Sequence, residues 1–410
     1  MGEILFLCHR IPFPPDRGDK IRSHHILKHL AGIAPVHVAT FADDDFDKGE
    51  ESDLAALATS YCLRRRAKPL VLAGIQAIAQ SRPVSLTAFH DSALAAYVDE
   101  VLASRPISAI YVFSGQMGQY VPADFAGRLI VDFVDVDSAK FQAYAEKKGV
   151  IGLIDAREAR MLRAEEARLA ARADVSLLIS QSEASLFESR LPDSLRGRVD
   201  VRVLANGIDS VSFDPAVVAP ETRMLDCPGP RMIFTGQMDY APNIDAARRV
   251  IEHILPLIRE ECSDATFHVV GRNPTAELQR YDGQNGCRVW GRVDDIRPWL
   301  KAADLAIVPL DIARGVQNKV LEAMAMALPV VLTSGAATGI DAVDGTDFTI
   351  ADSDLALAAT TLRLLRDHRQ TAELGLSARH FVTANASWQA ALAPLAELLD
   401  EPQRAANDAA

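Results

Sequence analysis

The sequence predicts an α/β protein with two doubly wound, Rossmann-like domains that face a central cleft. Short apolar runs alternate with segments of helical periodicity along the chain, which is typical of helices layered on parallel sheets. A length of 410 residues exceeds one ordinary hydrophobic core and favours two domains. Between the halves, a turn at 206–209 leads into a proline-rich, acidic stretch without periodicity that ends near Pro230. We therefore expect one domain at 1–205 and a second at 206–385.

Each domain is expected to consist of short buried strands, with helical segments between them. The candidate strands of the first domain are 4–8, 36–41, 109–113, 129–133, 175–180 and 201–204. Those of the second domain are 232–235, 266–270, 287–290, 305–309 and 330–333, with helical periodicity at 246–258 and 355–366. Ligands bind beyond the carboxyl ends of the strands in such folds, so the loops that follow strands are the candidate sites.

Composition and charge argue against several classes of function. An apolar content of 49% with 24% charged residues is that of an ordinary globular protein. The net charge of −12 argues against nucleic acid as a partner, because phosphate binding needs a basic face. The five cysteines show no CxxC spacing, which favours free thiols in a reducing compartment. No apolar run reaches the ~18 residues of a membrane span. The chain also runs from its N-terminus almost directly into a strand, and we expect a cytoplasmic protein.

The most informative motif lies at 311–331, which is predicted to form a loop, a short helix and a buried strand. Lys319 and Glu322 are three residues apart and share one helical face. The helix dipole disfavours a cation in the first turn, so the position of Lys319 makes sense if an anion docks at the same helix end. Glu322 can accept two hydrogen bonds from a diol. Diphosphate plus ribose fits this pair and indicates a nucleotide-sugar site; the alternative is a solvated surface ion pair.

A cationic loop braced by prolines follows the first strand, at 9–22. Arg10, Arg17, Lys20 and Arg22 make it basic in an acidic protein, and Gly18 precedes a helix that begins near Lys20. A basic loop at a helix N-terminus is suited to contact an anion at the cleft. The alternative is a rigid turn whose charges are merely solvated.

Three aspartates end the strand at 129–133. Asp135 and Asp137 point the same way if the chain stays extended beyond Asp132. Carboxylates at the carboxyl end of a strand suit a general base or an acceptor of hydrogen bonds from a hydroxyl substrate. Two alternatives stay open, namely a pair of metal-binding aspartates and helix N-capping by Asp137 or Ser138.

Strand-end loops of the second domain repeat the same plan. Gly236 permits close approach of a ligand to the backbone, and Asn243 is a good cap for the next helix. Arg272 and Arg292 follow two further strands. Neither GxGxxG nor GxxxxGK[ST] occurs, so dinucleotide and P-loop interpretations lose their main support.

Two further clusters invite other interpretations. His25 and His29 have the i, i+4 spacing of metal ligands, with His24 beside them, but the glutamate and third ligand of such zinc sites are missing. We expect no metal. The basic run at 64–68 could touch acidic lipid headgroups, or could be a solvated helix edge or strand entrance.

The order of several motifs resembles the family 4 glycosyltransferases of the GT-B fold. In the second domain these are Asn206-Gly-Ile-Asp209, Phe234-Thr-Gly-Gln237, Val270-Gly-Arg272, Gly291-Arg-Val293, and Val320-Leu-Glu-Ala-Met-Ala325 with Pro329-Val-Val331. In the first domain, the segments 10–22 and 132–138 resemble the sugar transferases associated with exosortase (PEP-CTERM) exopolysaccharide loci.

The resemblance implies retaining, metal-independent transfer of a sugar from a nucleotide-sugar to a glycan or lipid-linked acceptor. The donor, a UDP- or GDP-sugar, is a substrate, so no cofactor is implied. From the composition we expect a cytoplasmic protein, with two alternatives open: free in the cytoplasm, or in peripheral contact with the inner face of the plasma membrane. Residues 386–410 would form a helix that crosses back to the first domain, followed by a flexible tail.

The resemblance also carries roles over to individual residues. Glu322 would hold the ribose hydroxyls. Independently of the resemblance, the place of Asp135 and Asp137 at a strand end makes them our candidates to orient or deprotonate the acceptor. The remaining donor-binding residues would be Val316, Gln317, Asn318, Lys319, Gly236, Arg272 and Gly18, and the acceptor-binding residues Arg17 and Lys20.

Two departures from the family pattern bear on donor recognition. Arg314 stands where members usually place a second glutamate, eight residues before the one that matches Glu322. The usual Arg…Lys pair after the first donor-domain strand is replaced by the segment 237–243. Alternatives to a transferase are a nucleotide-sugar epimerase of the same fold, a nucleotide-sugar-binding regulatory protein, and a membrane-docked scaffold.

Overall fold

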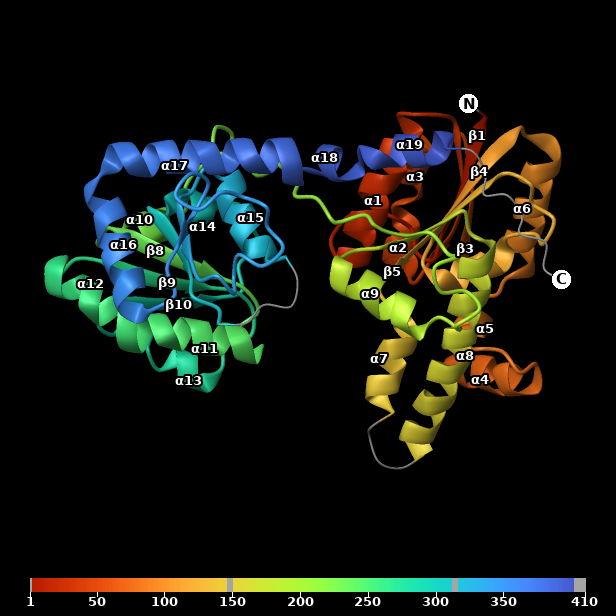
Figure 1. Ribbon diagram of the computed structural model, residues 1–410, viewed down its shortest axis with the longest axis horizontal. Coiled ribbons are helices and arrows are strands. Elements are labelled where there is room, and N and C mark those ends of the chain that lie inside the picture. The colour runs from red at the N-terminus through yellow and green to blue at the C-terminus, as the bar shows by residue number, and fades with distance from the viewer. Residues whose placement is uncertain (1, 146–149, 312–315, 402–410) are drawn as a thin grey trace. The chain divides into compact units, whose positions relative to one another are not determined.

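The computed structural model describes residues 2–145, 150–311 and 316–401. The chain divides into two compact units (Figure 1). Unit 1 comprises Met1–Asn206 with Leu392–Ala410, and unit 2 comprises Gly207–Ala391. The first division falls one residue from the boundary predicted at 205/206, and the chain returns to unit 1 at Leu392.

Unit 1 is built on a fully parallel sheet. Among the described residues it has seven strands, in the order β3-β2-β1-β4-β5-β6-β7. The strands are β1 Glu3–Cys8, β2 Val36–Ala42, β3 Ser60–Arg65, β4 Ile107–Phe113, β5 Arg128–Val134, β6 Val175–Leu178 and β7 Val201–Val203. The first six follow the doubly wound 3-2-1-4-5-6 order, in which the strand order reverses between β1 and β4 and leaves a ligand crevice at their carboxyl ends.

Helices connect the strands of unit 1 and cover the sheet. They are α1 Gly18–Ala31, α2 Asp45–Gly49, α3 Glu51–Leu57, α4 Leu70–Ala79, α5 Val84–Ala88, α6 Ser92–Ser104, α7 Asp137–Tyr144, α8 Val150–Arg172, α9 Gln181–Arg190 and α19 Pro394–Asp400, with a 3₁₀ turn at Gly115–Tyr120. α19 is tied to β5 because the Arg128 guanidinium donates to the carbonyl of Leu398 and pairs with Glu401 at 3.0 Å.

Unit 2 repeats the architecture. Its described residues form a parallel sheet of six strands in the order β10-β9-β8-β11-β12-β13, again the doubly wound order. The strands are β8 Arg231–Thr235, β9 Thr266–Val270, β10 Cys287–Gly291, β11 Leu305–Val308, β12 Val330–Leu332 and β13 Thr349–Ile350. β8, β9, β11 and β12 are almost wholly buried, as expected for a parallel sheet covered on both faces.

The helices of unit 2 lie on both sides of these strands, and Figure 1 shows α11 below them and α17 above. The helices are α10 Thr222–Leu225, α11 Ala241–Arg249, α12 Leu255–Glu261, α13 Ala276–Gln279, α14 Arg297–Ala302, α15 Asn318–Ala325, α16 Asp354–Arg366 and α17 His368–Phe381. π-helical turns at Val250–Ile254 and Val382–Ala386 follow α11 and α17, and α18, Trp388–Leu392, leads back to unit 1.

The predicted fold class is confirmed, with differences at the edges of the sheets. β3 and β13 were not expected; β13 is only two residues long, and the side chains of both strands are half-buried or exposed. The basic run at 64–68 begins in the last two residues of the edge strand β3, so the predicted helix edge and the predicted strand entrance are both wrong. The strand expected at 175–180 stops at Leu178, because Ser180 caps α9 through the backbone N–H of Glu183.

Candidate functional site

In unit 2, the end of β8 and the start of α15 meet around the side chain of Lys319. Its ammonium donates to the Asn243 side-chain oxygen at 2.5 Å and lies 4.5 Å from the centre of the Phe234 ring. A Cβ on Gly236 would lie 3.1 Å from the ammonium and 2.9 Å from the Asn243 amide nitrogen. Only glycine therefore leaves this space open without a shift of its neighbours.

The role of Asn243 differs from the helix cap that the sequence suggested. Tyr240 precedes α11 as its N-cap, and Asn243 lies inside the helix with its side chain buried. The Asn243 amide donates to the carbonyl of Gln237 at 2.9 Å, so its oxygen is left to face Lys319. Asn243 thus fixes the position of the ammonium.

Burial shifts the titration of both charged residues on α15. It lowers the pKa of Lys319 to about 8, against the opposing charge of Glu322. It also raises the pKa of Glu322, against the charge of Lys319. Among the described residues there is no ion pair between these two side chains within 4.0 Å, so the interpretation as a solvated surface ion pair is wrong. Each group is partly buried, Lys319 in the first turn of α15 and Glu322 one turn further along.

The N-terminal turn of α15 is arranged to meet an anion. Gln317 precedes the helix in an extended conformation, and its side chain makes no cap hydrogen bond. Backbone hydrogen bonds within the first turn begin with Val320, whose N–H donates to the carbonyl of Gln317. Val316 and Asn318 are exposed at this end. Backbone N–H groups at a helix start carry partial positive charge, and Lys319 adds a full one beside them.

The loop after β9 brings a second cation to the neighbouring strand end. Arg272 is exposed, and its guanidinium donates to the Gln237 side chain at 2.8 Å. Gly271 packs against the backbone of Gly236 so closely that an added Cβ would lie 1.6 Å from the Gly236 oxygen. Arg292 is also exposed, after β10. Arg314, the departure from the family pattern, lies outside the described residues.

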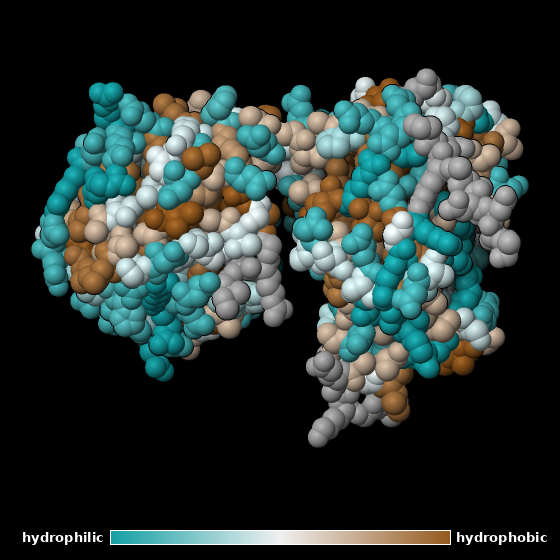
Figure 2. Space-filling view, viewed as in Figure 1, coloured by the Kyte–Doolittle hydropathy of each residue, from teal (hydrophilic) through white to brown (hydrophobic). Residues whose placement is uncertain are grey.

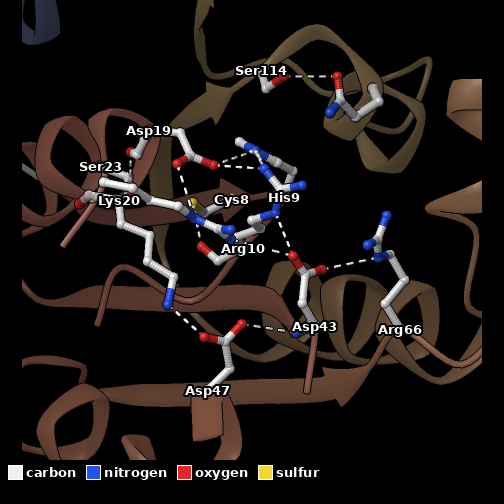
Figure 3. A network of polar contacts seen from close by, with 12 residues as sticks. Cys8, His9, Arg10, Asp19, Lys20, Ser23, Asp43, Asp47, Arg66 and Ser114 are labelled. Carbon is white, nitrogen blue, oxygen red and sulfur yellow. Dashed lines mark hydrogen bonds and ion pairs between the residues drawn. The ribbon is translucent and has the colours of Figure 1, made fainter. Parts of the chain in front are cut away.

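In unit 1, the cationic loop at 9–22 is held by carboxylates rather than left free (Figure 3). Arg10 donates to Asp19 and Asp43, each at 2.6 Å. Lys20 is buried and donates to Asp47 at 2.5 Å and to the Phe13 carbonyl at 2.9 Å. Asp43 and Asp47 follow β2, so they meet the loop only because β2 lies next to β1 in the sheet.

The remaining residues of this segment differ in their exposure to solvent. Arg17 is exposed, although it lies 3.3 Å from both Asp19 and Asp43. Gly18 has open space around the position of a Cβ. Arg22 is buried and pairs with Asp132 at 2.9 Å. Lys20 and Arg22 thus brace the loop from inside; contact of Arg17, Gly18 and Lys20 with a ligand stays a prediction.

Asp135 and Asp137 line a narrow pocket at the carboxyl end of β5. Val134, just before them, has φ of 69°, an uncommon conformation for a β-branched residue. Burial raises the pKa of Asp137, and the charge of Asp135 adds to this effect. Asp137 is the first residue of α7, whose N-cap is Val136 without a side-chain bond. The capping alternative for Asp137 and Ser138 is therefore wrong.

Two more titratable side chains lie near these aspartates, and the sequence had not singled them out. Glu166, from α8, accepts hydrogen bonds from the Ser138 backbone and hydroxyl at 2.8 and 2.5 Å. Burial raises the pKa of Glu166 to about 7. His9, directly after β1, stacks on Phe113 with ring centres 5.7 Å apart. Burial lowers the pKa of His9, while the nearby carboxylates of Asp19 and Asp137 oppose this. The position of His9 directly after a strand could have identified it from the sequence, whereas no sequence feature marks Glu166.

The described residues contain no group of three or more His, Cys, Asp or Glu side chains that could hold a metal ion. His24 packs edge-on against Phe13 and His25. The absence of a metal from the function stays a prediction. As for the membrane, no helix within the described ranges combines the length and apolarity needed to cross it.

Comparison with known proteins connects this geometry to a family. Residues 229–367 match the family described as Glycosyl transferases group 1, and this segment contains the Gly236, Lys319 and Glu322 cluster. No curated protein matches the chain.

Solved structures share the fold across both units. The chain is similar to HepE of Anabaena, solved in complex with UDP and glucose, with 16% identity and a TM-score of 0.56, covering 98% of this chain and 100% of that one. It is also similar to the sucrose-phosphate synthase of Thermosynechococcus elongatus, with 17% identity and a TM-score of 0.56, covering 97% and 98%. A glycosyltransferase of Rickettsia africae shares 14% identity with a TM-score of 0.60, covering 98% and 99%. These neighbours have the two-domain GT-B fold.

Proposed function

We propose, from the group 1 glycosyltransferase domain that residues 229–367 form, that this protein transfers a sugar from a nucleotide-sugar to an acceptor hydroxyl. The observation that carries the proposal is the partly buried Lys319 ammonium beside Gly236 at the start of α15. We further propose a family 4 type of reaction, retaining and metal-independent. The acceptor would be a lipid-linked or growing exopolysaccharide glycan.

The donor is proposed to bind through its diphosphate and ribose. The backbone N–H groups of Val316, Gln317 and Asn318 meet the diphosphate together with Lys319, and Arg272 supplies a second cation. As the bond between sugar and diphosphate breaks, negative charge grows on the leaving group. Hydrogen-bond donors and cations that are already in place stabilise this charge without reorganisation, which is commonly the largest contribution to catalysis.

Glu322 is proposed to accept hydrogen bonds from both ribose hydroxyls. Its carboxylate lies one turn beyond Lys319, and its raised pKa reflects a desolvated position that two donated hydrogen bonds would stabilise. Among the solved neighbours, HepE binds UDP and UDP-glucose. Those complexes make UDP the first nucleotide to test, with GDP as the alternative.

On the acceptor side, Asp135 and Asp137 are proposed to orient the hydroxyl and accept its proton. A carboxylate whose pKa is raised towards neutral pH is a better base than an ordinary one, and burial raises that of Asp137. Arg17 and Gly18 lie on the open side of the 9–22 loop, and we keep them as ligand contacts. Lys20 acts by holding that loop in place. We assign no protein nucleophile.

Calorimetric titration with UDP and 2′-deoxy-UDP tests the ribose assignment. Loss of hydrogen bonds to a charged acceptor costs about 1.5–3 kcal/mol, so Glu322→Ala should weaken UDP binding about 10- to 100-fold. Removing one ribose hydroxyl should weaken binding to the wild type but not to Glu322→Ala. Equal sensitivity of both proteins to the missing hydroxyl would overturn the assignment.

Transfer itself needs a separate assay with labelled nucleotide-sugars and lipid-linked acceptors. Label should move to the acceptor with the wild type and fall sharply with Asp137→Asn. Tight UDP binding without transfer from any donor would instead favour a regulatory binding protein. We also propose a cytoplasmic location with peripheral contact at the inner face of the plasma membrane.

A further inference from the structure

Helix α4, Leu70–Ala79, presents its bulky side chains to solvent and its small ones to the protein. Ala73 and Ala77 are fully buried. Val71, Ile75 and Ile78 are 75%, 61% and 68% exposed, and they form one stripe at i, i+4 and i+7. Leu72, 52% exposed, widens the stripe. A surface helix normally turns its apolar face to the core, so this helix is reversed.

The helix is firmly attached to unit 1 despite this orientation. The first turn begins where the backbone N–H of Ala73 donates to the carbonyl of Pro69, and the fully buried Ala73 and Ala77 pack the helix against unit 1. At the other end, the Arg157 guanidinium of α8 donates to the carbonyls of Ala77 and Arg82 at 3.1 and 3.2 Å. Tertiary contacts therefore hold the helix with its apolar face exposed. Figure 2 shows brown apolar atoms at the surface where Figure 1 places α4.

The chain around α4 is positively charged within an acidic protein. Residues 54–90 include Arg64, Arg65, Arg66, Lys68 and Arg82 but no aspartate or glutamate, whereas the whole chain carries a net charge of −12. The three consecutive arginines form ion pairs with carboxylates from outside this segment, at 3.4 Å to Asp91, 2.9 Å to Asp45 and 2.9 Å to Asp43. Their charge is thus largely compensated within the protein.

The cations that flank α4 directly are bound differently. Lys68 donates to the carbonyl of Thr87 at 3.0 Å, and Arg82 donates to the amide oxygen of Gln119 at 3.3 Å. These acceptors are neutral, and within the described ranges neither cation has a carboxylate within 4.0 Å. One uncompensated positive charge therefore lies at each end of the apolar stripe.

We propose that α4 lies in the interface of an anionic lipid bilayer. Its apolar stripe enters the boundary between headgroups and acyl chains, with Lys68 and Arg82 at the level of the lipid phosphates. A second protein molecule fits this surface less well. A ten-residue helix is about 15 Å long, and one such stripe falls far short of the about 800 Å² that each partner contributes to a stable interface. The inference rests on the peripheral membrane contact proposed above, and it does not depend on the transfer reaction.

Vesicle co-sedimentation of the full chain tests this surface. The wild type should bind vesicles of phosphatidylcholine with phosphatidylglycerol more tightly than phosphatidylcholine alone, and less tightly at high salt. The double variant Ile75→Gln/Ile78→Gln should lose about tenfold or more of the vesicle affinity. The matched control is Leu376→Gln on α17, 65% exposed, which should bind like the wild type.

Two further measurements distinguish loss of membrane binding from loss of the fold or of UDP binding. UDP affinity and thermal unfolding should be unchanged in the double variant, so a lost fold or donor site is distinguished from a lost membrane contact. In Ile75→Trp, the new indole should shift its emission to the blue on vesicles and be quenched by brominated lipids, unlike Leu376→Trp. Equal vesicle binding by the wild type and the double variant would overturn the proposal. So would a concentration-dependent dimer that the double variant abolishes without any change in vesicle binding.

Discussion

The protonation state of Lys319 offers a sharp test of the donor site. Burial lowers the pKa of Lys319 to about 8, so its ammonium is mostly present at pH 7 and mostly absent at pH 9. A bound diphosphate would raise this pKa, because an opposite charge favours the protonated form. Binding of UDP should therefore take up protons, and its affinity should fall as the pH rises through 8.

The size of this effect follows from the pKa. The protonated fraction of Lys319 is about 0.9 at pH 7 and about 0.1 at pH 9 for a pKa of about 8. If only the protonated form binds well, UDP affinity falls about tenfold between these pH values, or about 1.4 kcal/mol. Calorimetry at both pH values, in buffers of different ionisation enthalpy, measures the affinity and the proton uptake together.

The matched control for this experiment is Lys319→Arg. Arginine stays protonated over the whole range, so the variant should show little proton uptake and a nearly flat profile. Any ionisation of the uracil ring affects both proteins alike and cancels in the comparison. Parallel pH profiles for the two proteins, without proton uptake by the wild type, would refute a contact between Lys319 and the diphosphate.

Three further predictions concern stability and the shape of the site. Burial raises the pKa of Glu166 from 4.5 to about 7, so the free energy of unfolding should fall as the pH rises between these values. In urea unfolding, Glu166→Gln should therefore be more stable than the wild type by up to about 3 kcal/mol at pH 8. A stability difference that does not change with pH would contradict this. Arg22→Met should lower the free energy of unfolding by about 3–5 kcal/mol, because the buried Asp132 carboxylate loses its cationic partner and keeps only the Tyr111 hydroxyl and the Val134 N–H as donors. Adding Asp132→Asn should recover part of that loss, and additive effects of the two substitutions would argue against the pair. Gly271→Ala places a Cβ 1.6 Å from a carbonyl oxygen at the end of β8, so UDP affinity should drop; wild-type affinity would show that this strand end does not shape the site.

Local patterns in the sequence were enough to predict the architecture. Alternation of short apolar runs with helical segments identified the core strands, because strands buried on both faces of a parallel sheet must be apolar throughout. The edge strand β3 escaped detection for the converse reason, since its side chains are only half-buried or exposed. Lys319 and Glu322 were found because their spacing and place in a helix lie within one short motif.

The contacts that join distant segments could not be predicted in this way. Arg22 and Asp132 are 110 residues apart and meet because α1 and β5 are packed into one unit. Lys20 was predicted as a ligand contact, and its buried pairing with Asp47 of α2, 27 residues further along the chain, was not foreseen. Glu166 reaches Ser138 from a different helix, which no periodicity within either segment reveals.

The sequence by itself thus determined which residues face a core, where turns interrupt the elements, and that a cation and a carboxylate share one turn of α15. Tertiary structure alone decided which charges are neutralised and which stay available. It also decided that the bulky apolar side chains of α4 are exposed to solvent while its alanines Ala73 and Ala77 are buried. The physical reason is that side-chain periodicity is a local property, whereas burial and pairing depend on the order in which strands and helices pack.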